Sequence, residues 1–113
     1  MAYHLEFSAT AERDLTLIFD HLVESYRTFG EPPGEALSHA AARVRAIRRN
    51  ADRLLTAPQR GTKHDDLVPG LRHLTIERAI YWYEVDDTGA VVRVLAVFFG
   101  GQDHIRHMLV CLL

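Results

Sequence analysis

The chain has 113 residues, of which 48% are apolar and 25% charged, and its formal net charge is −2. This length suits one small domain, residues 1–113, and the composition excludes a disordered chain. The balanced charge gives no overall signal for nucleic-acid binding. A single cysteine excludes an internal disulfide, and no signal peptide or membrane-length apolar run is visible, so we expect a cytoplasmic protein.

The first half of the sequence predicts a strand followed by two helices. Polar and apolar residues alternate over residues 3–7, as in a strand with one buried face. Ser8 is a suitable N-cap for a first helix, whose apolar residues trace one face as far as Gly30. A second helix is predicted over residues 35–57, ended by Pro58. Because only a short link separates them, the two helices should form an antiparallel hairpin.

The second half changes to the two-residue period of strands. A polar loop over residues 58–70 precedes predicted strands at 71–77 and 79–85, a turn at 86–89 and a strand at 90–99 that is apolar on both faces. Helical spacing then places four apolar residues together: Ile105, Met108, Leu109 and Leu112. We therefore expect an α+β fold with an N-terminal strand, an antiparallel two-helix hairpin, a three-stranded antiparallel meander completing one sheet, and a short C-terminal helix.

Histidines and the cysteine give weak signals for chemistry. His104 and His107 share a side of the predicted C-terminal helix, but zinc needs three or four converging ligands, and neither HExxH nor paired CxxC is present. His4 and His73 should lie on outward strand faces. Cys111 lies in an apolar stretch and suits a covered thiol better than a nucleophile. We expect no metal, no cofactor and no catalytic cysteine.

Arginines and aromatic residues give the clearer binding signals. The second helix contains five arginines: Arg43, Arg45, Arg48, Arg49 and Arg53. They suit binding of phosphates, carboxylates or an acidic partner, or else they form ion pairs with the acidic first helix. The later strands combine Arg72 and Arg78 with the aromatic run at residues 81–83. These aromatics could stack on RNA bases, although core packing explains them equally simply. Arg72 follows a Pro-Gly bend, where a side chain can be aimed.

In order and spacing, several segments together resemble the RelE/ParE superfamily of toxins from bacterial type II toxin–antitoxin modules. The segments are SATAERDLTLIFDHL, RLLTAPQRGTKHDDLVPGLRHL, IYWYEV and VLAVFFGGQDHI. The loop into LVPGLRHL, the aromatic strand ending in Tyr83 and the GGQD stretch are most similar to the ParE branch. The resemblance implies a small toxin that a ParD-like antitoxin, with a ribbon-helix-helix N-terminus, neutralises in a hetero-oligomer.

The superfamily divides by target. RelE-like members cleave messenger RNA on the ribosome, whereas ParE-like members poison DNA gyrase without an enzymatic activity of their own. Nuclease members have basic or histidine residues at the end of the last core strand, where this chain has residues 97–100, VFFG. Phe99 also replaces a histidine common in ParE-like chains, and Gly101 and Gln102 replace basic residues. The resemblance therefore favours a non-enzymatic gyrase inhibitor over an endoribonuclease, with an inactive antitoxin-binding protein as a third alternative.

The expected contacts follow from this interpretation. For the target they are Arg72, Arg78, Asp103, His104 and Arg106. For the antitoxin they are Leu22, Tyr26, Arg45 and Arg49. Were the chain a nuclease instead, catalysis would use Arg72, Arg78, Tyr81 and His104.

Overall fold

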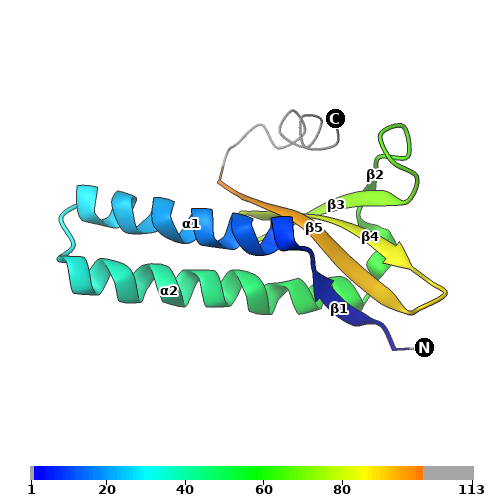
Figure 1. The fold of residues 1–113 in the computed structure, drawn as a ribbon, viewed down its shortest axis with the longest axis horizontal. Coiled ribbons are helices and arrows are strands. Elements are labelled where there is room, and N and C mark those ends of the chain that lie inside the picture. The colour runs from blue at the N-terminus through cyan, green and yellow to red at the C-terminus, as the bar shows by residue number, and fades with distance from the viewer. Residues whose placement is uncertain (1, 101–113) are drawn as a thin grey trace.

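The computed structural model describes residues 2–100, which form a two-layer α+β domain of a helical hairpin on a sheet (Figure 1). The helices are α1 (Ala9–Thr28) and α2 (Pro33–Asn50), followed by 3₁₀ turns η1 (Ala51–Leu55) and η2 (Pro58–Arg60). The strands are β1 (His4–Phe7), β2 (Thr62–Lys63), β3 (Leu71–Ile76), β4 (Ala79–Asp86) and β5 (Val91–Phe99). The predicted C-terminal helix lies outside the described residues.

Helix α1 begins and ends where its local sequence requires. The Ser8 hydroxyl accepts a hydrogen bond from the Ala11 backbone N–H at 3.0 Å, as expected of an N-cap. At the other end Gly30 has a φ of 99°, a left-handed conformation that favours glycine and stops the helix. The predicted boundaries of this helix are confirmed.

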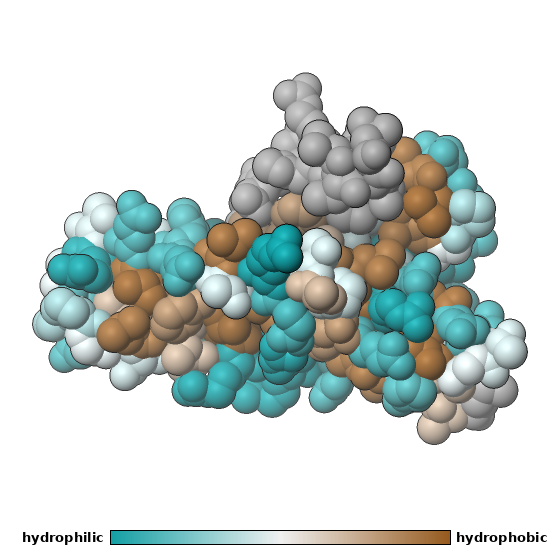
Figure 2. Space-filling model, viewed as in Figure 1, coloured by the Kyte–Doolittle hydropathy of each residue, from teal (hydrophilic) through white to brown (hydrophobic). Residues whose placement is uncertain are grey.

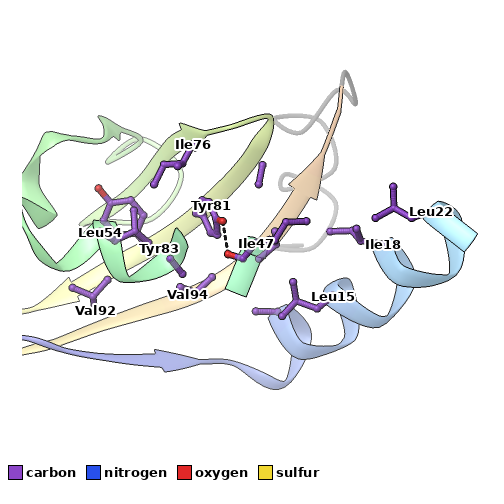
Figure 3. Packing of buried hydrophobic residues seen from close by; sticks show 14 of the residues in the cluster. Leu15, Ile18, Leu22, Ile47, Leu54, Ile76, Tyr81, Tyr83, Val92 and Val94 are labelled. Atoms are coloured by element: carbon purple, nitrogen blue, oxygen red, sulfur yellow. Dashed lines mark hydrogen bonds between the residues drawn. The ribbon is translucent and has the colours of Figure 1, made fainter. Parts of the chain in front are cut away.

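Helix α2 is shorter than predicted, because the chain tightens into η1 after Asn50. The backbone N–H groups at the C-cap bond to the Arg48 and Arg49 carbonyls, and the chain continues as the 3₁₀ turn η1. The Tyr81 hydroxyl of β4 donates to the Ile47 carbonyl at 2.6 Å (Figure 3). A tertiary hydrogen bond therefore joins the sheet to the last turn of α2.

The sheet has five strands in the order β1-β5-β4-β3-β2. The predicted β3–β4–β5 meander is present, but the sheet is mixed, since β1 pairs in parallel with β5. The short strand β2 was expected to be loop, and its two polar, exposed residues give no strand pattern. Strand β5 is central, as its apolar sequence on both faces predicts.

Apolar residues fill both sides of the sheet. The larger cluster joins the inner face of the hairpin to β3, β4 and β5, with Leu15, Ile47, Tyr81 and Val94 among its buried members (Figure 3). A smaller cluster on the opposite face includes Trp82. Tyr81, Trp82 and Tyr83 are all 0% exposed, so the aromatic run belongs to the core and is not an exposed stacking platform. None of the described helices is long and apolar enough to cross a membrane.

Candidate functional site

An open groove of about 880 Å³ lies where the free end of the hairpin meets the end of β5, and we call it the tip groove. Both helices contribute to it, together with the β3–β4 turn and the last strand. Its lining residues are His21, Leu22, Ser25, Tyr26, Phe29, His39, Arg43, Arg78, Phe99 and Gly100. The hairpin projects beyond the sheet (Figure 1), so the helix side of the groove belongs to the part of the hairpin that the sheet does not cover.

A stacked pair of rings forms the hairpin side of the tip groove. Tyr26 and His39 lie with their ring centroids 3.7 Å apart and their planes only 6° from parallel. His39 Nδ1 lies 3.1 Å from Glu31 Oε2, and the Glu31 backbone N–H donates to the Tyr26 carbonyl. These contacts fix the two helix ends relative to each other, so the groove wall is preformed.

Two guanidinium groups lie over Phe99 in the groove, that of Arg43 from α2 and that of Arg78 from the β3–β4 turn. The Arg43 carbon Cζ lies 5.2 Å from the Phe99 ring centroid, and that of Arg78 lies 5.8 Å from it. Both are cation–π distances. None of the described residues that line the groove is acidic. The groove is therefore cationic and aromatic, which suits an acidic segment with apolar or aromatic anchors.

A strained two-residue turn presents Arg78 to the groove. Glu77 and Arg78 have φ angles of 48° and 73°, the positive values of a type I′ hairpin turn, although neither is glycine or asparagine. The turn is held from α2 and β5. Asn50 Nδ2 donates to the Glu77 carboxylate at 2.6 Å, Arg43 donates to the Glu77 carbonyl at 3.1 Å, and the Gly100 N–H donates to the Arg78 carbonyl.

Several solved structures from toxin–antitoxin systems are similar to this chain. A chain of the RelBE2 toxin–antitoxin complex from Mycobacterium tuberculosis matches with a TM-score of 0.60 and 22% identity, over 88% of this chain and 99% of its own. A chain of the chromosomal ParDE system from P. aeruginosa matches with a TM-score of 0.61 and 24% identity, over 88% and 98%. A mutant E. coli RelE toxin in the free state matches with a TM-score of 0.59 and 15% identity, over 98% and 97%.

This chain has the RelE/ParE toxin fold. The resemblance expected from the sequence is thus confirmed at the level of the fold. No protein-family model matches the sequence, and no curated protein is similar to it.

In this RelE/ParE fold, the expected target contact Arg72 and the expected nuclease residue Tyr81 both have structural partners. Arg72 donates to the Gln59 and Gly61 carbonyls at 2.5 and 3.1 Å, so its guanidinium holds the chain before β2. Tyr81 is fully buried, and burial raises the pKa of its hydroxyl. A hydroxyl that is buried, bonded to Ile47 and hard to ionise is poorly placed for acid–base chemistry. Arg78, in contrast, is exposed in the tip groove.

The four residues expected to contact the antitoxin divide between two faces of the hairpin. Tyr26 and Leu22 both line the tip groove. Leu22 is only 6% exposed, because most of its side chain packs in the core. Arg45 lines a second hollow between α1 and α2 that also contains Arg48. Arg49 is exposed. The predicted target contacts Asp103, His104 and Arg106, and Cys111, lie outside the described residues.

Sequence reasoning missed part of the RelE/ParE-like groove and a second cluster. Arg43 was one of several helix arginines, and only the tertiary fold distinguishes it by placing it over Phe99. His64 was read as loop and His73 as an outward surface position, yet the two rings contact each other and Trp82. Their nine-residue separation across a loop matches no metal or catalytic spacing, so no local pattern could have indicated them.

One of the α2 arginines forms an ion pair with the acidic first helix, as the sequence suggested. Arg48 makes two hydrogen bonds to the Glu12 carboxylate, at 2.7 and 2.8 Å, and this pairing holds the pKa of Glu12 below its usual value. Arg48 also lies over the Phe7 ring at 4.9 Å. These contacts connect α2 to the start of α1 and to β1, away from the tip groove.

Proposed function

We propose that this chain is the toxin of a type II toxin–antitoxin module. Two independent lines support the proposal. Sequence segments over nearly the whole chain resemble the RelE/ParE superfamily, and the fold matches chains from two toxin–antitoxin systems over 88% of this chain. Because fold alone does not define function, the proposal also rests on a binding surface, and the tip groove is the clearest one in the described residues.

The partner in this proposal is a ParD-like antitoxin whose acidic, apolar segment binds the tip groove. Arg43, Arg78 and the Tyr26–His39 stack offer cations and flat rings on a wall already fixed by the fold. A flexible segment that orders on binding suits such an open surface. One similar structure is E. coli RelE bound to an antitoxin peptide, with a TM-score of 0.52 and 17% identity. We assign antitoxin contact to Leu22 and Tyr26, and to Arg45 and Arg49 on the neighbouring hairpin surface.

The proposed target is DNA gyrase, inhibited without catalysis. The observation that carries this choice is the end of β5, where Phe98 is buried and Phe99 lies beneath two arginines. Cleavage of RNA through its 2′-hydroxyl needs a base for that proton and a proton donor for the leaving oxygen. The described end of β5 supplies neither. Arg78 is the principal target contact, with Arg72, Asp103, His104 and Arg106 as further proposed contacts.

The test is expression of the full chain without its antitoxin, followed by two assays on the same cells. Gyrase poisoning predicts trapped DNA cleavage complexes and intact translated messages. The purified chain should also inhibit gyrase supercoiling, and Arg78→Ala should weaken this effect. Primer extension that finds cut messages, with no trapped complexes, would overturn the gyrase proposal.

A RelE-type endoribonuclease is the second candidate, and one observation favours it. Arg43 and Arg78 place two cations at the end of β5, although the strand sequence itself has none. Cations there could stabilise a phosphate in transfer. In that case Arg72, Arg78 and His104 would be the proposed catalytic residues, whereas Tyr81 of the expected set is buried and bonded to Ile47. A third candidate, an inactive protein that only binds its antitoxin, predicts no growth arrest but retained complex formation.

A further inference from the structure

Two histidines bring their ring nitrogens together on the face of the sheet opposite the hairpin. His64 Nε2 and His73 Nδ1 are 2.6 Å apart, and the ring centroids are 4.8 Å apart. Both rings lie against Trp82, with centroids 4.6 and 5.0 Å away. Trp82 alternates with Tyr81 and Tyr83, which pack under the hairpin, so the histidine pair lies on the other face.

The backbone fixes both histidines before any ligand binds. The His64 N–H donates to the Leu71 carbonyl at 2.8 Å, which continues the β2–β3 ladder by one residue. The His64 carbonyl accepts from the Leu67 N–H at 2.9 Å, which closes a turn. His73 lies within β3, opposite Trp82. The two imidazoles are thus a diagonal cross-strand pair on a rigid support.

The charges around the pair favour a cation. Strand alternation directs Lys63 and Arg72, which pair with each other in the ladder, to the opposite face. Arg72 is further held there by its bonds to the Gln59 and Gly61 carbonyls. Two exposed carboxylates, Asp65 and Asp66, directly follow His64 in the chain. The local field is therefore more negative than that of the cationic tip groove.

We propose that His64 and His73 bind a divalent transition-metal ion, with Cu²⁺ preferred over Ni²⁺ and Zn²⁺. Imidazole nitrogen suits all three ions, and affinity for a given nitrogen site peaks at copper. Metal–nitrogen bonds of about 2.0 Å require the two nitrogens to separate by less than about 1 Å from their present positions. Among residues 2–100 no third His, Cys, Asp or Glu joins the pair in a metal-binding cluster, so these two imidazoles are the protein ligands that the described chain offers.

Trp82 provides a direct measurement, because it is the only tryptophan in the chain. Titration of the full chain with Cu²⁺ should quench its fluorescence along a saturable 1:1 curve, since the ion would lie beside the indole. His64→Asn and His73→Asn should each weaken the apparent affinity by about tenfold or more, as loss of a ligand exceeds the effect of losing a ligand's hydrogen-bond partner. His4→Asn is the matched control, since His4 is an exposed histidine of β1 whose ring lies beside Glu6, on a strand at the other edge of the sheet from β2.

A second measurement separates metal binding from damage to the fold. Zn²⁺, which does not quench by itself, should displace Cu²⁺ and restore the fluorescence only when it is in large excess, because the site prefers copper. It should also raise the Tm of the wild-type chain by about 5 °C or more at a hundredfold excess over its Kd, and raise the Tm of the two variants much less. Equal quenching in His64→Asn, His73→Asn and wild type would overturn the proposal, as would a non-saturable curve. Neither readout depends on toxicity or on an antitoxin.

Discussion

At the scale of single residues, two buried tyrosine hydroxyls connect the sheet to α2 and to the η2 turn that follows it. Tyr81 donates to the Ile47 carbonyl at 2.6 Å, and Tyr83 donates to the Pro58 carbonyl at 2.8 Å. Gly61 also donates its N–H to the Tyr83 hydroxyl, and a Cβ at residue 61 would overlap that oxygen. Burial raises the pKa of both hydroxyls, so the folded state keeps them protonated.

The raised tyrosine pKa values predict a loss of stability in alkali. Above pH 10, the ordinary value, the unfolded chain releases tyrosine protons that the folded chain retains. The free energy of unfolding should then fall by about 1.4 kcal/mol per pH unit for each buried tyrosine. Tyr81→Phe should reduce this slope while lowering stability at neutral pH by about 1 to 2 kcal/mol, because the Ile47 carbonyl loses its partner. Urea unfolding at neutral and alkaline pH measures both, and an unchanged alkaline slope would contradict the assignment.

The sequence predicts the burial of these tyrosines but not their hydrogen-bond partners. The burial of Tyr81 and Tyr83 follows from strand alternation, which also accounts for Leu74 and Ile76 packing in the same core. Their hydrogen-bond partners are 25 to 34 positions away, so no local pattern could supply them. His73 was correctly placed on the second face of β3, but that face is also packed, which alternation alone does not reveal.

At the scale of elements, local signals predicted β1, α1, β3, β4 and β5 and the start of α2, but neither the end of α2 nor β2. The N-cap, the glycine stop and the two-residue period are local properties of the chain. The last turn of α2 accepts a hydrogen bond from Tyr81, and β2 is a strand through its pairing with β3. The β3–β4 turn likewise adopts positive φ angles with Glu77 and Arg78, residues that turn statistics disfavour.

This turn predicts a variant that is more stable and less toxic. Arg78→Gly relieves a left-handed backbone and should raise the free energy of unfolding by about 0.5 to 1 kcal/mol. It also removes the cation over Phe99, so growth arrest should weaken under the proposed function. Unfolding in urea and growth after induction measure the two effects. Arg78→Lys is the control, because it keeps a charge and the strain; equal toxicity of the glycine variant would remove Arg78 from the target contacts.

The part of β5 that continues past its pairing with β1 predicts a role for Asp14. Strand β1 ends at Phe7, which pairs with Val94, and the Val97 N–H beyond it donates to the Asp14 carboxylate at 2.9 Å. Asp14→Ala should leave this N–H unpaired, lower stability by about 1 to 3 kcal/mol and increase aggregation. Asp14→Asn retains an acceptor and should behave more like wild type. Thermal unfolding and light scattering test this, and equal behaviour of the two variants would exclude the edge-blocking role.

At the scale of the whole molecule, the projecting hairpin exposes apolar surface among polar side chains (Figure 2). Leu17, Phe29 and Leu37 are 58%, 87% and 49% exposed, which is unusual for large apolar residues. Phe29 borders the tip groove, whereas Leu17 lies outside it. The sequence predicted an arginine-bearing hairpin that binds a partner, but the groove itself arises only where α1, α2, the β3–β4 turn and β5 meet.

The groove predicts that antitoxin affinity depends on Tyr26 and not on Leu17. Tyr26→Ala removes a stacked ring at the centre of the groove wall and should weaken binding of the cognate antitoxin by about thirtyfold, corresponding to about 2 kcal/mol. Leu17→Ala removes an exposed side chain elsewhere on the same helix and should have little effect. Calorimetry with the purified antitoxin compares them. Equal affinities for both variants would place the antitoxin on another surface.

The position of β5 has a consequence for when the chain can fold during its synthesis. This strand lies between β1 and β4, yet it is the last of the described strands to leave the ribosome. Strand β1 pairs with it across a separation of 87 residues. Until Val91–Phe99 emerges, β1 has no neighbour and the hairpin has no complete sheet to cover. A nascent chain that stops before residue 91 therefore lacks the tip groove and the floor beneath both helices. Under the proposed function, a chain that is still being synthesised therefore lacks the surface that would bind a target or an antitoxin.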